Sequence, residues 1–255
     1  MTRSTAPNPR QLAADARKQL RAAAQHWPPR RATSFFKPDE EVYTIGLSAP
    51  KLRQVERRLY GSVRASWGGA AAVQFADVLL RERHLEGRSL GLMLLARFSR
   101  DFEADLLARA HDWLAGDRCD NWALTDLLGT KVLAPLLQRF PALAERLKVW
   151  AGSRNLWLRR SALVALVPLA RQGQQLALAY SVATKLQPDR SDLIQKAAGW
   201  LLRECGRTNP RRLATYLMAH GPRVPRTTLR YAIERFPQAQ RDELMERTRA
   251  AGAPA

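Results

Sequence analysis

Cysteine is scarce in this 255-residue chain, which contains only Cys119 and Cys205. Two cysteines so far apart in sequence form no disulfide framework, and their small number favours a reducing compartment. The four histidines do not have the spacing of metal ligands, and neither a CxxC nor an HExxH motif occurs. We therefore expect a cytoplasmic protein, and no metal is expected.

Several other familiar signals are missing. No glycine-rich phosphate loop of the P-loop or Rossmann kind occurs, so no cofactor and in particular no nucleotide cofactor is expected. The N-terminal residues lack the apolar core of a signal peptide, and no apolar run reaches transmembrane length. The sequence predicts neither secretion nor a membrane span.

Acidic residues are few relative to basic ones. The chain has 42 Lys and Arg against 23 Asp and Glu, for a formal net charge of +19. This excess indicates a polyanionic partner, most often nucleic acid. An anionic membrane surface is the alternative, but the basic residues are spread along the chain and form no single polybasic run or amphipathic anchor.

Strand-like alternation is almost absent, and nearly every segment after residue 9 has helical periodicity. The region 30–47 is the exception and is expected to be an irregular loop that carries Phe35, Phe36 and Tyr43. Residue pairs that break helices divide the chain into about a dozen or more short helices. These pairs are Trp27-Pro28, Lys37-Pro38, Gly68-Gly69, Phe140-Pro141, Gln187-Pro188, Asn209-Pro210, Gly221-Pro222 and Phe236-Pro237.

A repeat of about 36 residues underlies these helices. Similar tripeptides start at Arg88, Arg160 and Lys196, which are 72 and 36 residues apart, and the missing member of the series falls at 124–126. Such a period predicts an all-α fold, an α-solenoid of HEAT-like antiparallel helix pairs, curved with a concave basic groove. We expect a single domain over 9–250, between a flexible N-terminus (1–8) and a flexible tail (251–255). In this register Asp126 takes the place of three apolar or small residues, namely Leu90, Ala162 and Ala198.

Two expected helices carry a tryptophan outside their apolar face. In the helix that starts at Ser191 or Asp192, Trp200 lies between Lys196 and Arg203, opposite a face of apolar residues. In the other helix, Trp122 and Asp126 lie one turn apart on the face away from its leucines. Each tryptophan could instead pack against a second helix, because solenoid helices often bury two faces.

A third helix contributes two candidate arginines, Arg159 and Arg160. Arg160 has apolar neighbours at i−4, i+3, i+4 and i+7, so it fits a structural arginine as well as a residue of the concave side.

This combination of side chains suits one kind of chemistry. Aromatic faces attract cations, a carboxylate stabilises positive charge that develops nearby, and Lys and Arg neutralise phosphates. A purine alkylated on a ring nitrogen is cationic, and its loss from DNA passes through an oxocarbenium-like sugar. One carboxylate can suffice, since the alkylated base departs neutral and needs no acid.

Four segments resemble the AlkD-type DNA alkylation repair glycosylases, in the right order and over roughly residues 9–245. They are Tyr43–Pro50, Asn121–Asp126, Asn155–Ala162 and Gln195–Glu204 with the following Thr208-Asn209-Pro210. The resemblance implies a HEAT-like solenoid that binds DNA in its concave face and excises cationic N3- or N7-alkylated purines without drawing the base into a deep pocket. Ala123 departs from the family, in which many members have an acidic residue at that position.

The resemblance also implies roles for particular residues. Asp126 would be the catalytic carboxylate, Trp122 and Trp200 would hold the lesion nucleotide, and Arg160 would contact the DNA backbone. Phe36 corresponds to a further aromatic beside the lesion. Lys196, Arg203 and Arg159 complete the residues expected to bind DNA.

The function predicted from the sequence is therefore a monofunctional alkylpurine DNA glycosylase, a monomer that acts on double-stranded DNA and is associated with the nucleoid when bound. A non-catalytic solenoid that binds branched or distorted DNA is the alternative, and a protein scaffold of the HEAT or TPR type is a third possibility. A net charge of +19 argues against the scaffold. Asp126 argues against a pure DNA-binding protein, which gains nothing from a carboxylate among phosphates.

Overall fold

The structure, a computed structural model, describes residues 7–36 and 40–249. The tail expected at 251–255 lies outside these residues, as do the first six residues of the expected N-terminal segment. The chain divides into two compact units, with the boundary between Leu136 and Leu137. No helix in the described part of the chain is long and apolar enough to cross a membrane.

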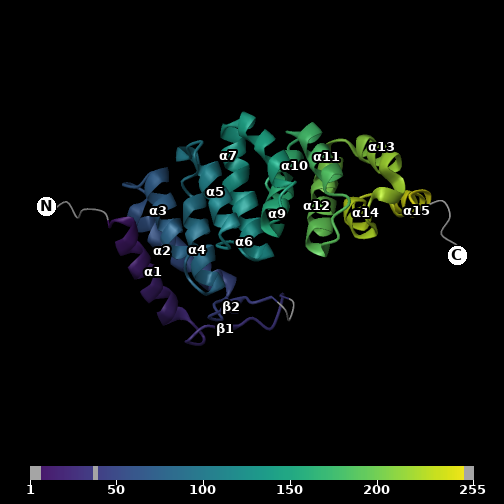
Figure 1. Cartoon of the computed structure of the whole chain (residues 1–255). Helices are drawn as coiled ribbons and strands as arrows, with labels where there is room; N and C mark the ends of the chain where they lie inside the picture. Colours follow the sequence, from purple (N-terminus) through teal and green to yellow (C-terminus); the bar gives the residue numbers. More distant parts are fainter. Residues whose placement is uncertain (1–6, 37–39, 250–255) are drawn as a thin grey trace. The chain divides into compact units, whose positions relative to one another are not determined.

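The first unit consists of short helices and one strand pair. Its elements are α1 (Pro9–Ala23), β1 (Arg30–Arg31), β2 (Tyr43–Thr44), α2 (Ala49–Val63), α3 (Gly69–Leu79), α4 (Leu85–Ala96), the 3-10 helix η1 (Ser99–Asp101), α5 (Leu106–Ala115), α6 (Trp122–Leu128) and the π-helix η2 (Gly129–Leu133). Helix α7 (Ala134–Arg139) contains the boundary between the units. Figure 1 shows α4 and α6 side by side, and the two helices pack together.

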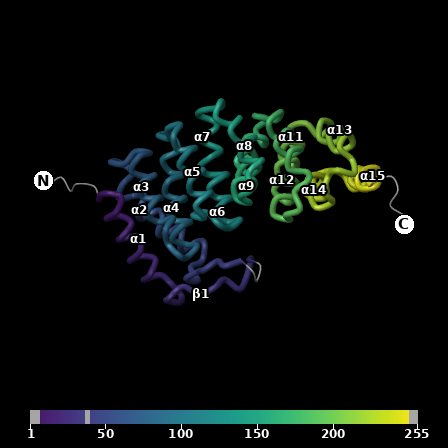
Figure 2. Tube along the Cα trace, viewed as in Figure 1, coloured from purple at the N-terminus to yellow at the C-terminus, as the bar shows by residue number. Residues whose placement is uncertain are grey.

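The second unit consists of short helices and contains no strand in its described part. Its elements are the 3-10 helix η3 (Pro141–Arg146), α8 (Leu147–Trp150), α9 (Leu156–Val164), α10 (Val167–Arg171), α11 (Leu176–Lys185), α12 (Asp192–Thr208), α13 (Pro210–His220), the 3-10 helix η4 (Gly221–Arg223), α14 (Arg226–Ala232) and α15 (Gln238–Arg247). Helix α12 packs against both α9 and α14, and Figure 2 follows this succession along the chain.

Capping residues explain where many of these helices begin. Asn8 and Gln11 form a reciprocal capping box at the start of α1. The side chains of Asn121, Asn155 and Asn209 accept backbone N–H groups in the first turns of α6, α9 and α13. Proline is tolerated in the first turn of a helix, and Pro210 therefore follows its capping residue directly.

The predicted all-α fold is confirmed, and its repeat can be measured. The second helices of successive pairs begin after His84, Asn121, Asn155, Ser191 and Pro225, at spacings of 37, 34, 36 and 34 residues. These spacings agree with the period of about 36 residues that the tripeptides indicated. The fold is an α-solenoid of stacked helix pairs.

The position assigned to Asp126 in that repeat was wrong by two residues. Asp126 is the fifth residue after the capping Asn121, as Arg160 is after Asn155 and Lys196 is after Ser191. The residue equivalent to Ala162 and Ala198 is Leu128, which is fully buried as they are. The error arose because the spacing between capping residues is not constant, so a fixed period of 36 misaligns α6.

The region expected to be one irregular loop contains a short antiparallel strand pair. Arg30 pairs with Thr44 and Arg31 with Tyr43, and β2 also packs beside α4. The segment was too short for its alternation to be visible in the sequence. The segment Tyr43–Pro50 leads into the next helix, because Pro50 lies in the first turn of α2, and Gly46 precedes it with a φ of +72°.

Both cysteines are buried and free. Cys119 lies in the turn before α6, whereas Cys205 faces the core from α12. Burial raises the pKa of each thiol to about 12. The thiols are therefore protonated and unreactive at neutral pH.

Candidate functional site

Helix α6 holds the predicted carboxylate and one predicted tryptophan in fixed positions. The buried side chain of Asn121 accepts the N–H of Leu124 at 3.1 Å and donates to the Asp120 carboxylate at 3.2 Å. The helix therefore begins at Trp122, and Asp126 follows one turn later. Both side chains are half-buried, while the intervening Leu124 is in the core. Both side chains therefore lie on the face of α6 away from its buried leucines, where the sequence predicted them.

An aromatic pair forms beside this carboxylate. The rings of Phe36 and Trp122 have centroids 5.4 Å apart and planes inclined by 34°, so the loop between β1 and β2 reaches α6. The preceding Phe35 is 88% exposed and has a φ of +68°. Phenylalanine is costly in that conformation and in water, and such outliers are often found at functional sites.

The loop is anchored to the rest of the first unit by a buried carboxylate. Glu86 on α4 accepts the N–H groups of Ile45 at 3.0 Å and Leu47 at 3.2 Å, together with the Thr44 hydroxyl. Burial raises the pKa of Glu86, but hydrogen bonds from His84, Thr44 and the backbone together lower it below its usual value. The carboxylate is thus ionised at neutral pH and fixes the base of the loop.

A cavity of about 750 Å³ adjoins this loop. Its lining includes Phe35, Phe36, Arg30 and Arg31, and also Glu86. The cavity therefore combines aromatic and positively charged walls, which suit an aromatic ligand that carries phosphate.

The helix changes its geometry immediately after the carboxylate, which the sequence did not predict. Gly129 begins the π-helix η2, and the carbonyl of Asp126 accepts the Thr130 hydroxyl at 2.7 Å. Gly129 itself is buried. Single π-turns within helices occur frequently at functional sites.

In the second unit, α12 presents its predicted polar face. Trp200 is half-buried, whereas Ile194, Ala198 and Leu201 on the opposite face are buried. Lys196 forms an ion pair with Asp192 at 3.3 Å. Arg203 pairs with Glu234 and lies 3.6 Å from the buried Glu204. The predicted residues therefore share one face, and each of the two cations has an acidic neighbour.

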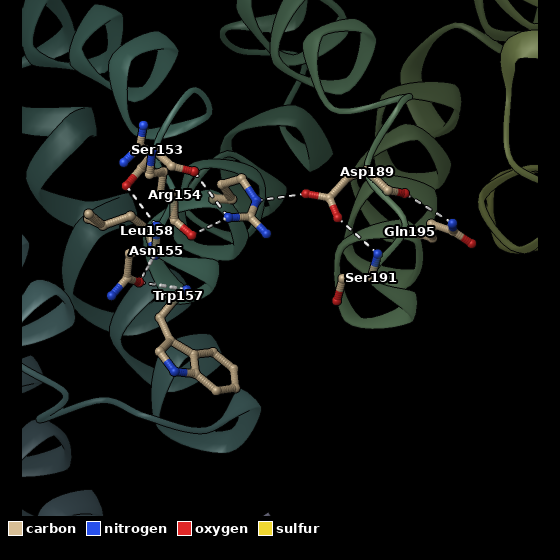
Figure 3. A network of polar contacts seen from close by, with 9 residues as sticks. Ser153, Arg154, Asn155, Trp157, Leu158, Asp189, Ser191 and Gln195 are labelled. Atoms are coloured by element: carbon tan, nitrogen blue, oxygen red, sulfur yellow. Dashed lines mark hydrogen bonds and ion pairs between the residues drawn. The ribbon is translucent and has the colours of Figure 1, made fainter.

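A network of polar contacts joins α9 to the turn before α12, where Asp189 lies (Figure 3). Arg159 is its central residue. Its guanidinium donates to Asp189 at 2.7 Å and to the carbonyls of Ser153 and Arg154 at 3.0 and 2.7 Å. Asp189 in turn accepts the N–H of Ser191, the capping residue of α12, at 2.9 Å. These contacts assign a structural role to Arg159, whose contact with DNA stays a prediction.

Arg160 is 6% exposed, and its Nη1 donates to the Leu193 carbonyl at 2.5 Å. Of the two roles left open for this residue, its burial favours the structural arginine. The bond also fixes the first turn of α12 against α9, so Arg160 positions the helix that carries Trp200.

Two further aromatic residues lie near these helices and were not singled out from the sequence. Tyr231 on α14 is 39% exposed, and its Cβ would lie 2.4 Å from a Cβ added at Gly199, the residue before Trp200 in sequence. Trp157 on α9 is half-buried and points away from the Arg159 network (Figure 3). The position of Tyr231 depends on how α14 packs against α12, which no pattern within either helix indicates.

A solenoid of helix pairs with a large positive charge and half-buried tryptophans on three of its second helices defines a class, the helical-repeat proteins that bind nucleic acid. The family model described as "DNA alkylation repair enzyme" matches residues 16–236, which is most of the chain. The chain belongs to this family and is an enzyme of alkylated-DNA repair.

Two solved structures share the fold. A predicted DNA alkylation repair enzyme from Enterococcus faecalis is 15% identical, with a TM-score of 0.68 over 93% of this chain and 97% of that chain. The protein smu.31 from Streptococcus mutans UA159 is 16% identical, with a TM-score of 0.52 over 77% of this chain and 90% of that chain. No curated protein matches this sequence significantly.

Proposed function

We propose that the protein is a monofunctional DNA glycosylase that hydrolyses the N-glycosidic bond of cationic N3- or N7-alkylated purines in duplex DNA. The observation that carries this proposal is the arrangement on α6, where the half-buried Asp126 lies one turn from Trp122 and the Phe36 ring packs on Trp122. An anionic group beside an aromatic pair suits a cationic base and the cationic sugar that its departure creates.

The reaction needs one carboxylate. The bond between C1′ of the sugar and the base nitrogen breaks, and its electron pair neutralises the cationic base. The oxocarbenium-like sugar that remains is stabilised by Asp126, and water adds to C1′ and loses a proton. Asp126 also orients this water. The face of Trp122 attracts the cationic base before the bond breaks, and the reaction proceeds without base flipping.

The second unit supplies contacts to the same DNA. The half-buried indole of Trp200 offers a stacking surface, and Lys196 on the same face offers a cation for phosphate. The family membership supports DNA as the substrate.

Release of free base from methylated duplex DNA tests this proposal, with Asp126→Asn compared with wild type at matched salt. Asparagine keeps the size of the side chain but removes its charge, so we expect base release to fall at least about a hundredfold. Binding of undamaged duplex should be preserved or tightened, because a carboxylate near phosphates is lost. Asp112→Asn, which removes an exposed carboxylate from α5 in the same unit, is the matched control and should keep its activity.

Undiminished release by Asp126→Asn would show that this mechanism is wrong. If wild type and variant both release no base but bind DNA tightly in a salt-sensitive manner, the protein is the alternative, a solenoid that binds branched or distorted DNA. Branched duplexes would then be the substrates to compare.

A further inference from the structure

Four arginines of the second unit surround one fully buried carboxylate. Glu204 on α12 is 0% exposed, and the arginines reach it from three elements. The guanidinium nitrogens of Arg171, Arg203, Arg207 and Arg235 lie 2.9, 3.6, 3.9 and 3.3 Å from its oxygens. Arg171 ends α10, Arg203 and Arg207 belong to α12, and Arg235 follows α14.

This cluster has more positive charge than its carboxylates require. A buried carboxylate is neutralised by one well-placed arginine, and further arginines around it repel one another. Arg203 has a second partner in Glu234, so four cations face two anions. An unbalanced group of this kind is typical of a surface that binds an anion.

Three of these arginines are accessible and have donors to spare. The side chains of Arg171, Arg207 and Arg235 are 49%, 51% and 46% exposed. Among the described residues, Arg171 and Arg235 each donate one hydrogen bond to Glu204, and Arg207 lies too far from it for a hydrogen bond. A guanidinium has five N–H donors in a planar fork that fits the oxygens of a phosphate group.

The cluster continues the face of α12 that carries Trp200. At about 100° per residue, Lys196, Trp200, Arg203 and Arg207 fall within an arc of about 60°. Trp200 and Arg207 are seven residues apart, about 10 Å along the helix axis, which corresponds to about three nucleotides of one DNA strand.

We propose that Arg171, Arg207 and Arg235 form a binding site for a backbone phosphate of DNA, with Glu204 orienting the guanidinium groups of Arg171 and Arg235. Arg203, the fourth arginine beside Glu204, forms an ion pair with Glu234 and is not assigned to the phosphate site. The site rests on the proposed function only in that its anion belongs to the DNA that is repaired. It would hold the strand a few nucleotides from the base that contacts Trp200.

Binding of a short undamaged duplex, measured over a range of salt concentrations, tests the site without requiring base release. The triple variant Arg171→Gln, Arg207→Gln and Arg235→Gln should bind about tenfold more weakly at low salt. The slope of log affinity against log salt should fall by about one, the value for one phosphate contact. Arg207→Gln alone should show part of this loss with an unchanged melting temperature, because Arg207 makes no hydrogen bond to Glu204.

The matched control removes three exposed arginines of the same unit that lie outside the cluster, by Arg146→Gln, Arg223→Gln and Arg247→Gln. A cluster variant with the wild-type slope, or a control with the same loss of slope, would overturn the site. If the cluster variant alone loses slope but wild type releases no base, the phosphate site stands and the glycosylase proposal fails. If wild type releases base but the cluster variant keeps the wild-type slope, the glycosylase proposal stands and the phosphate site fails. A wild type that does not bind duplex DNA contradicts both.

Discussion

Helices α6 and α12 occupy equivalent places in the repeat, yet one equivalent position is acidic in α6 and basic in α12. The fifth residue after the capping residue is Asp126 in α6 and Lys196 in α12, and each helix has a half-buried tryptophan. A repeat fold provides the same backbone position many times, so one substitution can change what a position does. We infer that α6 was adapted for chemistry on a cation and α12 for binding an anion.

The surroundings of the two helices also differ, in a way that fits these two roles. In the first unit, the loop between β1 and β2 brings Phe36 onto Trp122. In the second unit, α14 packs closely on α12 at Gly199, and the arginine cluster continues beyond Trp200. The carboxylate therefore lies beside an aromatic pair, whereas Trp200 has cations on both sides along its helix.

The largest expected effect comes from a substitution that disrupts the packing of α12 against α14. An added Cβ at Gly199 would lie 2.4 Å from the Tyr231 Cβ and 2.7 Å from the Thr228 carbonyl oxygen. Gly199→Ala should therefore force α14 away and lower the free energy of unfolding by about 3 kcal/mol. Denaturant unfolding measures this change.

Gly61 on α2 is the matched control, because an added Cβ there meets nothing within 4 Å. Gly61→Ala should stabilise the protein by roughly 0.5–1 kcal/mol, since alanine favours the helix. Equal responses at the two glycines would contradict the close contact between α12 and α14.

Replacing Trp122 and Trp200 separately with alanine tests whether the two tryptophans have different roles. Trp200→Ala should weaken binding of alkylated duplex by about 2 kcal/mol, the range of a lost base–aromatic stack. Trp122→Ala should mainly slow base release from bound DNA, because the indole lies one turn from Asp126. Binding titrations and single-turnover base release separate these effects.

If Trp200→Ala leaves the preference for damaged DNA unchanged, that residue packs against protein and does not recognise the lesion. If the two variants have the same profile, the division between chemistry on α6 and binding on α12 is wrong.

The smallest expected effect concerns Glu86, the carboxylate that anchors the loop between β1 and β2. The pKa of Glu86 is lower in the folded protein than in the unfolded chain, where it is about 4.3. Its ionised form therefore stabilises the fold above the unfolded pKa. This stabilisation is lost as the pH falls through the pKa of the folded protein. Glu86→Gln should cost about 1 kcal/mol near neutral pH. Unfolding measured between about pH 7 and pH 3 should show a smaller difference from wild type at the acid end.

Exposed Glu243, which pairs with Arg247 on α15, provides the control, and Glu243→Gln should have almost no effect on stability at any pH. A constant difference between Glu86→Gln and wild type across this range would show that the charge of Glu86 does not stabilise the loop.

Much of this organisation could be predicted from the sequence, because it depends on local patterns. The apolar face of α12 left Trp200 outside the core. The proline and glycine pairs within the described residues lie between helices or at their ends, whereas Lys37-Pro38 falls outside the described residues. Capping residues such as Asn121 and Asn155 needed only their own helix to act. The family resemblance rested on the same short segments and is confirmed by the family match.

Contacts between distant segments could not be predicted. The Leu193 carbonyl that Arg160 contacts lies 33 residues later, and the acidic partner of Arg159, Asp189, comes from the turn that precedes α12. The repeat register of Asp126 failed for a related reason, because the connections between helices differ in length.

The sequence by itself determined the helices, their period, the positive charge and the placement of two tryptophans outside the core, since each follows from residue type and helical periodicity. Only the tertiary structure decided which charged groups are engaged and which remain available. It placed Phe36 on Trp122, buried Arg160, and gathered four arginines around Glu204. The reason is physical: the environment of a charged side chain is set by neighbours that packing brings together across the chain.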